Sequence, residues 1–382
     1  MNLDIRLDES HIESKLWDIW ATVYRRDDPI PIEDRRIRPG ELNYIAYNQS
    51  EPVACYGIWP MDCARREGTM RCAGVLGVAV LPEHRHQGVG RQMMLHSLQE
   101  LRQQDFVFAS LYAFRDSYYR NFGYEVCGQR WRFKVPQHRL PKWDVTLPVR
   151  KIAKEDVEVL KQAYEPFIRA RSGSAIRRPG DWENRLGKRA PMIYAVGDPI
   201  EAYALTTMEG SFWEDLTISE VVWSTPRGYE SIMGVLAGLC INRSALIWCE
   251  PSDSPYMAMH WDQGATVEIF RQSMYRILDV PGALKSLKTD LTGEFTIEIV
   301  DPFIAACNGC WSVRYSPEGI EARRASSADL RCSVGAFSQA FLGQPSWDNL
   351  RAIGKIESFS DRADRAAAAL LTPTPTVCMD FF

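Results

Sequence analysis

The sequence predicts a mixed α/β (α+β) protein built from three units. The chain has 382 residues, which is long for a single hydrophobic core when a domain takes about 150 residues. Strand-like and helix-like segments alternate over residues 1–145, and part of that order returns over residues 146–278. Residues 279–382 differ, because alternating strands come first and helices follow.

The first unit reads as strands interrupted by a few helices. The apolar residues at 89, 93, 94, 98 and 101 follow helical spacing. Gly123 stands where a left-handed helix C-cap is favoured. We expect helices at 13–25, 88–103 and 117–122, and strands at 43–49, 53–59, 72–81, 106–113, 124–126 and 130–135, with a loop at 60–71.

The second unit repeats part of this pattern in a drifted form. Residues 199–205 (PIEAYAL) resemble residues 52–58 (PVACYGI), and residues 220–226 (EVVWSTP) fall where the first unit has the strand that ends at Pro82. This order indicates an internal duplication, with chance similarity of two strands as the alternative. In the third unit we expect strands at 294–301, 311–315, 319–323 and 329–334, a helix at 361–370 and an extended aromatic tail.

Composition excludes several classes of protein. Hydrophobic residues make up 46% and charged residues 25% of the chain, and the net charge of −4 provides no basic field for nucleic acid or an anionic membrane. No run approaches the ~18 apolar residues of a membrane span, and the acidic N-terminus lacks a signal-peptide core. The ten cysteines are irregularly spaced, and Cys307 and Cys310 form a lone CxxC. We therefore expect a cytoplasmic protein with reduced thiols and no metal site.

The stretch VAVLPEHRHQGVGRQ, residues 78–92, has the composition of a phosphate-binding turn. Gly88 and Gly90 allow a sharp turn and a close approach of the backbone to a ligand. A helix that begins near Gly88 would direct unpaired N–H groups and its positive end toward an anion. The peptide groups of Val78 and Val80 could bind an extended amide chain along a strand edge. A tight turn without a ligand is the structural alternative.

The string V-x-V-x-P-x-x-R-x-x-G-x-G, which runs from Val78 to Gly90, resembles the acetyl-CoA-binding motif of the GCN5-related N-acetyltransferases (GNAT). It differs from a dinucleotide fingerprint, which needs G-x-G-x-x-G directly after a strand. The resemblance implies an acetyl-CoA co-substrate. The residues that it assigns to coenzyme binding are Val78, Ala79, Val80, Arg85, His86, Gln87, Gly88, Val89, Gly90, Arg91, Phe114 and Arg115.

A second motif, SYYRNFGYE at residues 117–125, supplies a candidate acid. In the same superfamily, a tyrosine on the short helix before a Gly-aromatic step lies near the thioester sulfur, and Tyr119 matches that position. Its phenol, with an ordinary pKa of about 10, could protonate the departing thiolate. Tyr118 and Tyr124 are rival candidates, and an aromatic packing cluster is the structural alternative.

Across its whole length the chain resembles the Eis (enhanced intracellular survival) family. The resemblance rests on HRHQGVG, YRNFGY, the drifted second unit, the RILDVPGAL junction and the aromatic end. It implies an active GNAT domain at 1–145, a degenerate GNAT domain at 146–278 and a sterol-carrier-like domain at 279–382. It also implies a homo-oligomer, a hexamer in that family. The second unit has Arg227-Gly228-Tyr229 after Pro226 in place of the two-glycine turn, which makes a poor phosphate site.

The same resemblance places the C-terminal carboxylate, here that of Phe382, in the active site as the group that accepts the proton of the amine. Burial of the two terminal phenylalanines would disfavour the charged form and make it a better base. A frayed tail is the structural alternative. The other candidate bases are Asp62, Glu67, His84 and His86.

These inferences predict an acetyl-CoA-dependent N-acetyltransferase that acts on a primary amine by direct transfer. Its partners are the amine and coenzyme A, and the family suggests aminoglycosides or other polycationic amines as acceptors. The alternative is a lipid- or partner-binding protein that uses the sterol-carrier-like unit and carries a vestigial transferase.

Overall fold

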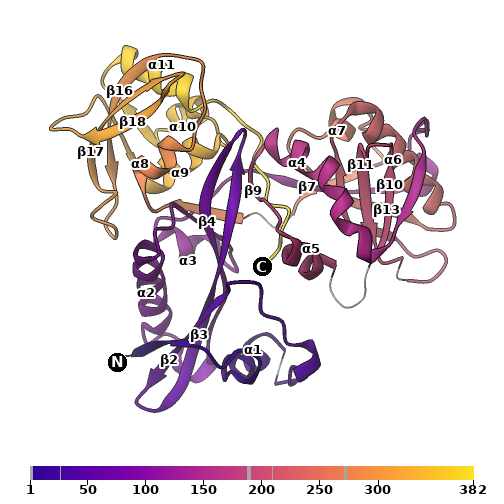
Figure 1. Cartoon of the computed structure of the whole chain (residues 1–382), viewed down its shortest axis with the longest axis horizontal. Helices are drawn as coiled ribbons and strands as arrows, with labels where there is room; N and C mark the ends of the chain where they lie inside the picture. The colour runs from indigo at the N-terminus through magenta and orange to yellow at the C-terminus, as the bar shows by residue number, and fades with distance from the viewer. Residues whose placement is uncertain (1–2, 26, 187–190, 209, 271–272) are drawn as a thin grey trace.

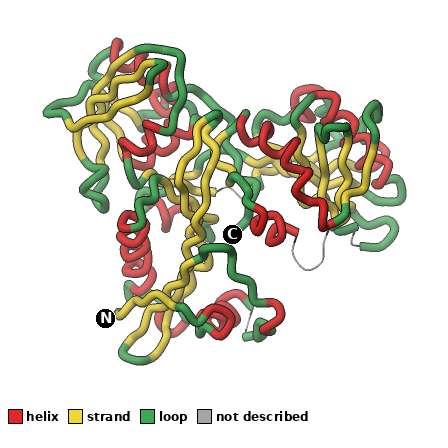
Figure 2. Tube along the Cα trace, viewed as in Figure 1, coloured by secondary structure: helices red, strands yellow, loops and turns green. Residues whose placement is uncertain are grey.

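The computed structural model describes residues 3–25, 27–186, 191–208, 210–270 and 273–382. Within these ranges the strands form three sheets with helices packed on them (Figure 1; Figure 2). This arrangement confirms the predicted mixed α/β fold. No helix in these ranges is long and apolar enough to cross a lipid bilayer.

The first sheet has the strand order β1-β2-β3-β4-β5-β15-β6, and β9 lies beside β3. Its strands are β1 (Asp4–Asp8), β2 (Leu42–Asn48), β3 (Glu51–Arg65), β4 (Gly68–Val80), β5 (Phe108–Tyr112), β6 (Glu125–Val126), β9 (Ser172–Ala175) and β15 (Ser273–Ile277), and its helices are α1 (Leu16–Tyr24), α2 (Val89–Gln103) and α3 (Asp116–Arg120). Strands β2, β3 and β4 are antiparallel, and helix α2 then crosses over so that β5 runs parallel to β4.

The second sheet has the order β14-β7-β13-β12-β11-β10-β8. Its strands are β7 (Arg130–Pro136), β8 (Val149–Ile152), β10 (Met192–Val196), β11 (Ala202–Thr206), β12 (Leu216–Trp223), β13 (Ala245–Pro251) and β14 (Thr266–Ile269), and its helices are α4 (Lys161–Arg169), α5 (Pro179–Leu186), α6 (Pro226–Leu239) and α7 (Pro255–Met259). The series β10-β11-β12-α6-β13 repeats β2-β3-β4-α2-β5, including the parallel pair after the helix. The predicted internal repeat is therefore confirmed.

The two sheets exchange strands, which corrects one prediction. The strand expected at 130–135 to close the first sheet is β7, and β7 pairs with β13 and β14 of the second sheet. In return β15, which lies at the end of the second unit in the chain, pairs with β5 and β6 of the first sheet. Either edge can satisfy the backbone of a strand, so local sequence does not reveal which sheet it joins.

The loop expected at 60–71 is also absent from the described chain. Strands β3 and β4 continue through this stretch as one long hairpin, with Asp62 opposite Arg71. The turn is made at Arg66, whose φ of 51° is left-handed. The far end of β3 pairs with β9, which connects the hairpin to the second unit. Polar residues at the surface of a long hairpin resemble a loop in sequence.

The third sheet has the order β18-β17-β16-β19-β20. Its strands are β16 (Gly293–Val300), β17 (Gly309–Ser316), β18 (Gly319–Arg324), β19 (Leu330–Ser333) and β20 (Ile356–Ser358), and its helices are α8 (Val280–Lys285), α9 (Val334–Leu342), α10 (Trp347–Ala352) and α11 (Asp361–Leu370). Its core is continuous with that of the first unit, because α9 packs on the first sheet with the rings of Phe341 and Phe108 5.7 Å apart.

The C-terminal tail leaves the third unit and ends in the middle of the molecule, near β3, β4 and α5 (Figure 1). The tail runs beside β9: the Ser172 N–H donates to the Pro375 carbonyl at 3.0 Å, and the Val377 N–H donates to the Ser172 carbonyl at 2.9 Å. The Thr376 N–H donates to the Gln344 side chain at 2.9 Å. These bonds contradict a frayed tail.

Candidate active site

The site begins where β4 and β5 separate. The two strands pair only between Cys72–Gly74 and Phe108–Ser110, and each continues beyond that pairing. The register of β4 against β3 shifts just after it, and Gly77 there has a left-handed φ of 57°. The Trp20 ring occupies the place of the missing side chain, since a Cβ on Gly77 would lie 2.3 Å from it. Helix α1 therefore packs on the bulge that holds the strands apart.

The separation leaves peptide groups of β4 at an open edge. The Leu81 N–H donates to the Val53 carbonyl of β3 at 3.0 Å, so antiparallel alternation turns the peptide groups of Val78 and Val80 away from β3. The Val78 carbonyl accepts a bond from the Tyr24 hydroxyl at 2.8 Å. The Val80 carbonyl accepts one from Arg85 Nε at 3.1 Å. This edge has the geometry expected for pairing with an extended amide chain.

Helix α2 begins with an open N-terminus. Gly88 is its N-cap residue with a left-handed φ of 82°, and no side chain caps the helix. The first N–H groups of a helix have no acceptor within the helix, so those from Val89 to Arg91 face the turn. Gly90 is required for close packing, because a Cβ there would lie 2.6 Å from the Tyr118 hydroxyl. An anion of phosphate size fits this geometry and charge.

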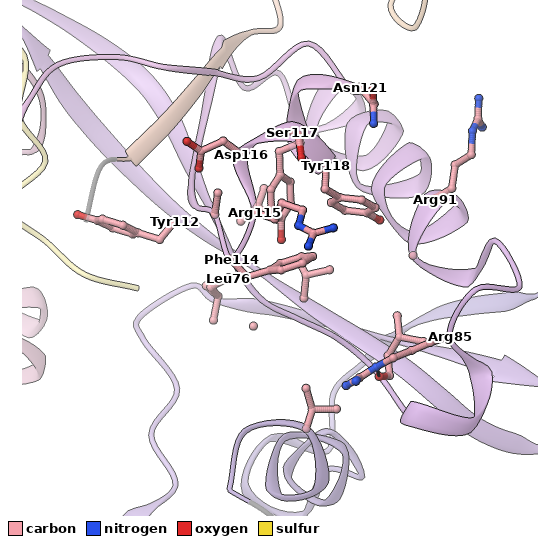
Figure 3. Close-up of a pocket in the computed structure, with 18 of the residues that line it drawn as sticks. Leu76, Arg85, Arg91, Tyr112, Phe114, Arg115, Asp116, Ser117, Tyr118 and Asn121 are labelled. Atoms are coloured by element: carbon pink, nitrogen blue, oxygen red, sulfur yellow. Dashed lines mark hydrogen bonds between the residues drawn. The ribbon is translucent and has the colours of Figure 1, made fainter. Parts of the chain in front are cut away.

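A cavity of about 1460 Å³ joins the open strand edge, the helix start and the C-terminal tail (Figure 3). The predicted site residues that line it are Val78, Val80, Arg85, His86, Gly88, Val89, Gly90, Arg91, Phe114, Arg115, Tyr119 and Phe382. Two predicted residues do not line it. Ala79 faces the other side of the strand, opposite Cys55 and against α1, and the Gln87 side chain turns back to the Glu83 carbonyl. The orientation of Ala79 follows from the alternation of side chains along a strand, since Val78 and Val80 face the cavity.

Charge along the cavity is mostly positive. Among the described lining residues, Arg85, Arg91 and Arg115 come from three different segments, and Asp116 is the one side-chain carboxylate. In Figure 3, Phe114, Arg115 and Tyr118 face Arg85 across the space. This distribution favours a polyanionic ligand such as a nucleotide phosphate.

Tyr119 lies on α3 and is almost fully buried, at 3% exposure. Burial raises the pKa of its phenol well above the ordinary value, and the neighbouring tyrosines 24, 118 and 124 raise it further. The proton therefore stays on the phenol at any working pH. The centroids of the Phe114, Tyr118 and Tyr124 rings lie 5.1–6.4 Å from that of Tyr119, at steep interplanar angles. Tyr119 therefore belongs to an aromatic cluster and also lines the cavity.

The two terminal phenylalanines end the tail inside this cavity. The Phe382 ring lies over Gly74, where a Cβ would be 2.7 Å away, and its centroid is 5.5 Å from those of Trp59 and Tyr112. The Phe381 ring lies 4.8 Å from Tyr112. Figure 3 shows Tyr112 at the end of the cavity next to the end of the chain.

Buried polar contacts anchor the tail just before these rings. The Asp380 carboxylate accepts bonds from Arg177 Nε at 2.8 Å and from the Tyr164 hydroxyl at 3.2 Å. Arg177 also holds the Glu220 carboxylate through two bonds of 2.8 and 2.7 Å. The Tyr112 hydroxyl donates to the Asp380 carbonyl at 3.1 Å. The second unit thus positions the end of the chain in the first.

The equivalent helix start in the second unit is closed by its own side chains. The Thr225 side chain caps α6 by accepting the Gly228 N–H at 3.0 Å. The Glu201 carboxylate accepts bonds from Thr225 Oγ1 and from Arg227 Nε and Nη2 at 2.5–2.8 Å. A carboxylate of the protein therefore lies beside this helix start, in accord with the prediction of a poor phosphate site.

The other candidate bases lie in two different places. His84 and His86 line the cavity, whereas Asp62 and Glu67 are exposed on the long hairpin outside it.

The first cysteine of the CxxC pair, Cys307, is buried and donates to the Leu278 carbonyl at 3.0 Å. Among the described residues, no three His, Cys, Asp or Glu side chains gather as metal ligands would.

Sequence reasoning missed several lining residues, and among them only Ser117 and Asn121 belong to a motif. The missed residues are Val23, Tyr24, Val75, Leu76, Gly77, Tyr112, Ala113, Asp116, Ser117, Asn121 and Ile269. Tyr112 and Asp116 adjoin predicted residues, so proximity in the chain could have indicated them. Ile269 comes from the second unit, and no local signal places it here.

A matched domain family shows that the chain is an acetyltransferase. Residues 5–127 match the acetyltransferase (GNAT) domain family, and residues 280–379 match the sterol carrier protein domain family. GNAT domains use acetyl-CoA as a co-substrate. The chain is thus an enzyme with a GNAT domain at its N-terminal end and a sterol carrier protein domain at its C-terminal end.

Relatives along most of the chain have corresponding names. An uncharacterized N-acetyltransferase of Streptomyces avermitilis is 24% identical over 366 residues, covering 88% of this chain and 87% of its own. An uncharacterized N-acetyltransferase of Streptomyces coelicolor is 27% identical over 387 residues, covering 89% of this chain and 91% of its own.

Solved structures share the whole fold. A GCN5-related N-acetyltransferase from Anabaena variabilis superimposes with a TM-score of 0.87 at 19% identity, and Eis1 from Mycobacterium abscessus superimposes with 0.80 at 21% identity. Each comparison covers all of both chains.

Proposed function

We propose that this enzyme transfers the acetyl group of acetyl-CoA directly to a primary amine, with Tyr119 as the acid and the carboxylate of Phe382 as the base. The observation that carries this proposal is the single cavity lined by the open α2 N-terminus, the Tyr119 phenol and the last residue of the chain. A GNAT domain supplies the class of reaction, and the cavity supports the roles proposed for individual residues.

In this proposal, the coenzyme supplies an activated acetyl thioester whose amide arm pairs with the edge at Val78 and Val80. Its phosphates bind at the turn from His86 to Arg91, next to Arg85 and Arg115. The Phe382 carboxylate accepts the proton of the incoming ammonium, and the neutral nitrogen forms the new C–N bond to give a tetrahedral oxyanion. The C–S bond breaks when this adduct collapses. Peptide N–H groups of the β4 edge stabilise the oxyanion.

The Tyr119 phenol then donates its proton to the thiolate that leaves. Its high pKa supports this role, because a phenol that remains protonated is always ready to donate. The nitrogen that has attacked then loses a second proton, which regenerates the phenol, and the proton that the carboxylate removed first passes to solvent. The reaction therefore balances as ammonium plus acetyl thioester giving amide, thiol and one proton. Holding both reactants in one cavity contributes much of the acceleration.

One extra residue at the end of the chain tests the role of the carboxylate. Appending a single alanine after Phe382 keeps both rings and moves the carboxylate by about 3.5 Å. We expect loss of amine-dependent CoA release while the Kd for acetyl-CoA, measured by calorimetry, stays unchanged. Removal of Phe381 and Phe382 together should have the same effect. Full turnover in both variants would remove the carboxylate from the mechanism.

Membership of the Eis family, a homo-hexamer, a cytoplasmic location and units divided at 145 and 278 are further parts of this proposal. Full-length superposition on Eis1 supports the shared fold, and the other parts rest on the family resemblance. Light scattering after gel filtration tests the oligomer. Aminoglycosides are the acceptors that the family resemblance suggests, and they should be assayed alongside simpler amines.

The lipid-binding alternative has less support from the third unit. A second cavity of about 800 Å³ lies there, but charged side chains line it, including Glu294, Arg314, Glu321, Arg362 and Arg365. A site for a lipid would have a mostly apolar lining. Binding of acetyl-CoA with no affinity for fatty acids separates the two functions.

A further inference from the structure

The end of the cavity that holds the C-terminal tail has an apolar lining drawn from both units. Tyr112, Phe381, Phe382 and Leu76 line it from the first unit and the tail, and Ile269 lines it from the end of β14. The side chains of Phe381 and Ile269 are each 58% exposed although they face a cavity. Large apolar side chains left accessible inside a cavity mark a surface that a ligand can cover.

These residues lie at one end of the cavity. Ile269 stands four residues before Ser273, and Ser273 pairs directly with Tyr112. The Tyr112 ring is 4.8 Å from Phe381 and 5.5 Å from Phe382. The coenzyme turn from His86 to Arg91 belongs to the other end, beside α2.

Negative charge is scarce at this end. The Asp380 carboxylate is held by Arg177 at 2.8 Å. Glu41 lies 3.7 Å from Arg38, and burial raises its pKa. The Arg38 guanidinium donates to the Phe381 carbonyl at 3.2 Å, which brings a cation close to the tail. Asp116 is the one side-chain carboxylate of the described lining, so the terminal carboxylate of Phe382 is left as the main anion for an acceptor amine.

We infer that the acceptor carries a single amine on an apolar, preferably aromatic, group and is not a polycation. This inference rests on the proposed function. The ammonium meets the Phe382 carboxylate, and the apolar group packs against Phe381, Tyr112 and Ile269 at ring distances that favour aromatic pairs. A polycation would have to desolvate further ammonium groups in a cavity whose described lining offers them no side-chain carboxylate other than Asp116, which opposes binding.

Three amines of graded chemistry test the inference on the full chain. Initial rates of CoA release with phenethylamine, ethylamine and spermidine give kcat/KM for each. We expect phenethylamine to exceed ethylamine by about tenfold or more, because the ring adds about 1.4 kcal/mol of apolar contact. Spermidine should be no better than ethylamine. A preference for spermidine or for an aminoglycoside would overturn the inference.

Substitutions of the lining residues test whether the preference for phenethylamine arises at this end of the cavity. Phe381→Ala and Ile269→Ala should each lower the ratio of phenethylamine to ethylamine, whereas general damage to the site would lower both rates together. Ile269→Asp should raise the relative rate with spermidine. Phe359→Ala is the matched control, because Phe359 is 68% exposed in the third unit outside this cavity, and it should leave the ratio unchanged. An unchanged ratio in Phe381→Ala and Ile269→Ala would overturn the inference.

Failure of the inference and failure of the proposed function give different results. Calorimetry with the CoA-loaded protein measures binding of phenethylamine and spermidine without any reaction. If no amine is acetylated but phenethylamine binds in a manner that depends on Phe381, the apolar subsite stands and the transferase proposal falls. If amines are acetylated without any aromatic preference, the transferase proposal stands and the subsite falls.

Discussion

Arg177 binds two carboxylates at once, and one of them belongs to Asp380, two residues before the end of the chain. Its Nε donates to Asp380 at 2.8 Å, while its terminal nitrogens hold Glu220 at 2.8 and 2.7 Å. The Arg177 and Glu220 side chains are fully buried. A contact made by the second unit therefore determines where the C-terminal residue lies in the first.

Asp380→Asn should loosen the end of the tail. The substitution leaves Arg177 and Arg185 with only Glu220, and an uncompensated buried charge costs about 3 kcal/mol. We expect this loss in urea unfolding, and a decrease in kcat of about tenfold or more because the terminal carboxylate is misplaced. The Kd for acetyl-CoA should not change.

Asp301→Asn provides the matched control for that experiment. Asp301 and Arg276 form a fully buried pair at 2.9 Å that does not touch the tail. We expect a similar loss of stability but a smaller loss of kcat than in Asp380→Asn, because the position of the terminal carboxylate does not depend on this pair. An equal loss of kcat in both variants would attribute the Asp380 effect to stability alone.

Glu220 should contribute stability that depends on pH. Burial by itself would raise its pKa, but Arg177 and Arg185 outweigh burial and hold the pKa well below the ordinary value. Because the folded pKa is lowered, the contribution is present above the unfolded pKa and is lost as the pH falls through the folded pKa. Relative to wild type, Glu220→Gln should lose about 3 kcal/mol at pH 7 and less below about pH 4.3.

The effect of Glu250 on stability should depend on pH in the opposite direction. Burial raises its pKa, and the hydrogen bonds from Ser254, Trp248 and Tyr229 offset this only in part. The folded protein therefore favours the protonated form, and stability is lost as the pH rises from the unfolded pKa to the folded pKa. Glutamine can still accept from Tyr229 and Trp248 and donate to Ser254. Urea unfolding of Glu250→Gln at pH 7 should give at least the stability of the wild type, and an advantage that shrinks toward pH 4.

Tyr119→Phe should slow turnover by about a hundredfold, which is typical for loss of a general acid. Acetyl-CoA binding should persist because the ring remains. Tyr118→Phe, on the same helix, is the control and should retain most activity. The pKa of Tyr119 is raised, so its ionisation should not produce a fall in rate on the alkaline side of the pH profile. Equal losses in both variants would show that the Tyr119 hydroxyl has no special role and would remove it from the mechanism as the acid.

Gly90→Ala should weaken acetyl-CoA binding by about tenfold, since a methyl group there displaces the Tyr118 hydroxyl and narrows the turn. Gly238→Ala is the helical control: a Cβ at Gly238 meets nothing within 4 Å, so this substitution should stabilise α6 by up to about 1 kcal/mol. Calorimetric Kd values for the two variants decide the point, and unaltered affinity in Gly90→Ala would exclude a role for this turn.

Much of the first unit could be predicted because its signals are local. The two glycines of the turn and the apolar spacing of 89–101 both belong to one short segment, and α2 lies at 89–103 as expected within one residue. The same holds for α11, predicted at 361–370 and found at Asp361–Leu370. Backbone conformation and amphipathic spacing depend on neighbouring residues, so a sequence contains them directly.

The exchange of β7 and β15 between sheets could not be predicted in this way. Both strands have ordinary strand composition, and either sheet edge would satisfy their backbone. The long β3–β4 hairpin was missed for a related reason, because its polar turn region is supported by pairing with β9, a strand about 110 residues further along the chain.

The sequence by itself determined the class of fold, the acetyl-CoA motif with its helix start, and the tyrosine on the short helix, because each depends on residues close together in the chain. Only the tertiary structure decided which sheet each strand joins, how Arg177 anchors Asp380, and that Ile269 and Phe381 share a cavity with Tyr119. Those relationships join residues more than one hundred positions apart, and their free energy comes from burial and pairing that exist only after the chain has folded.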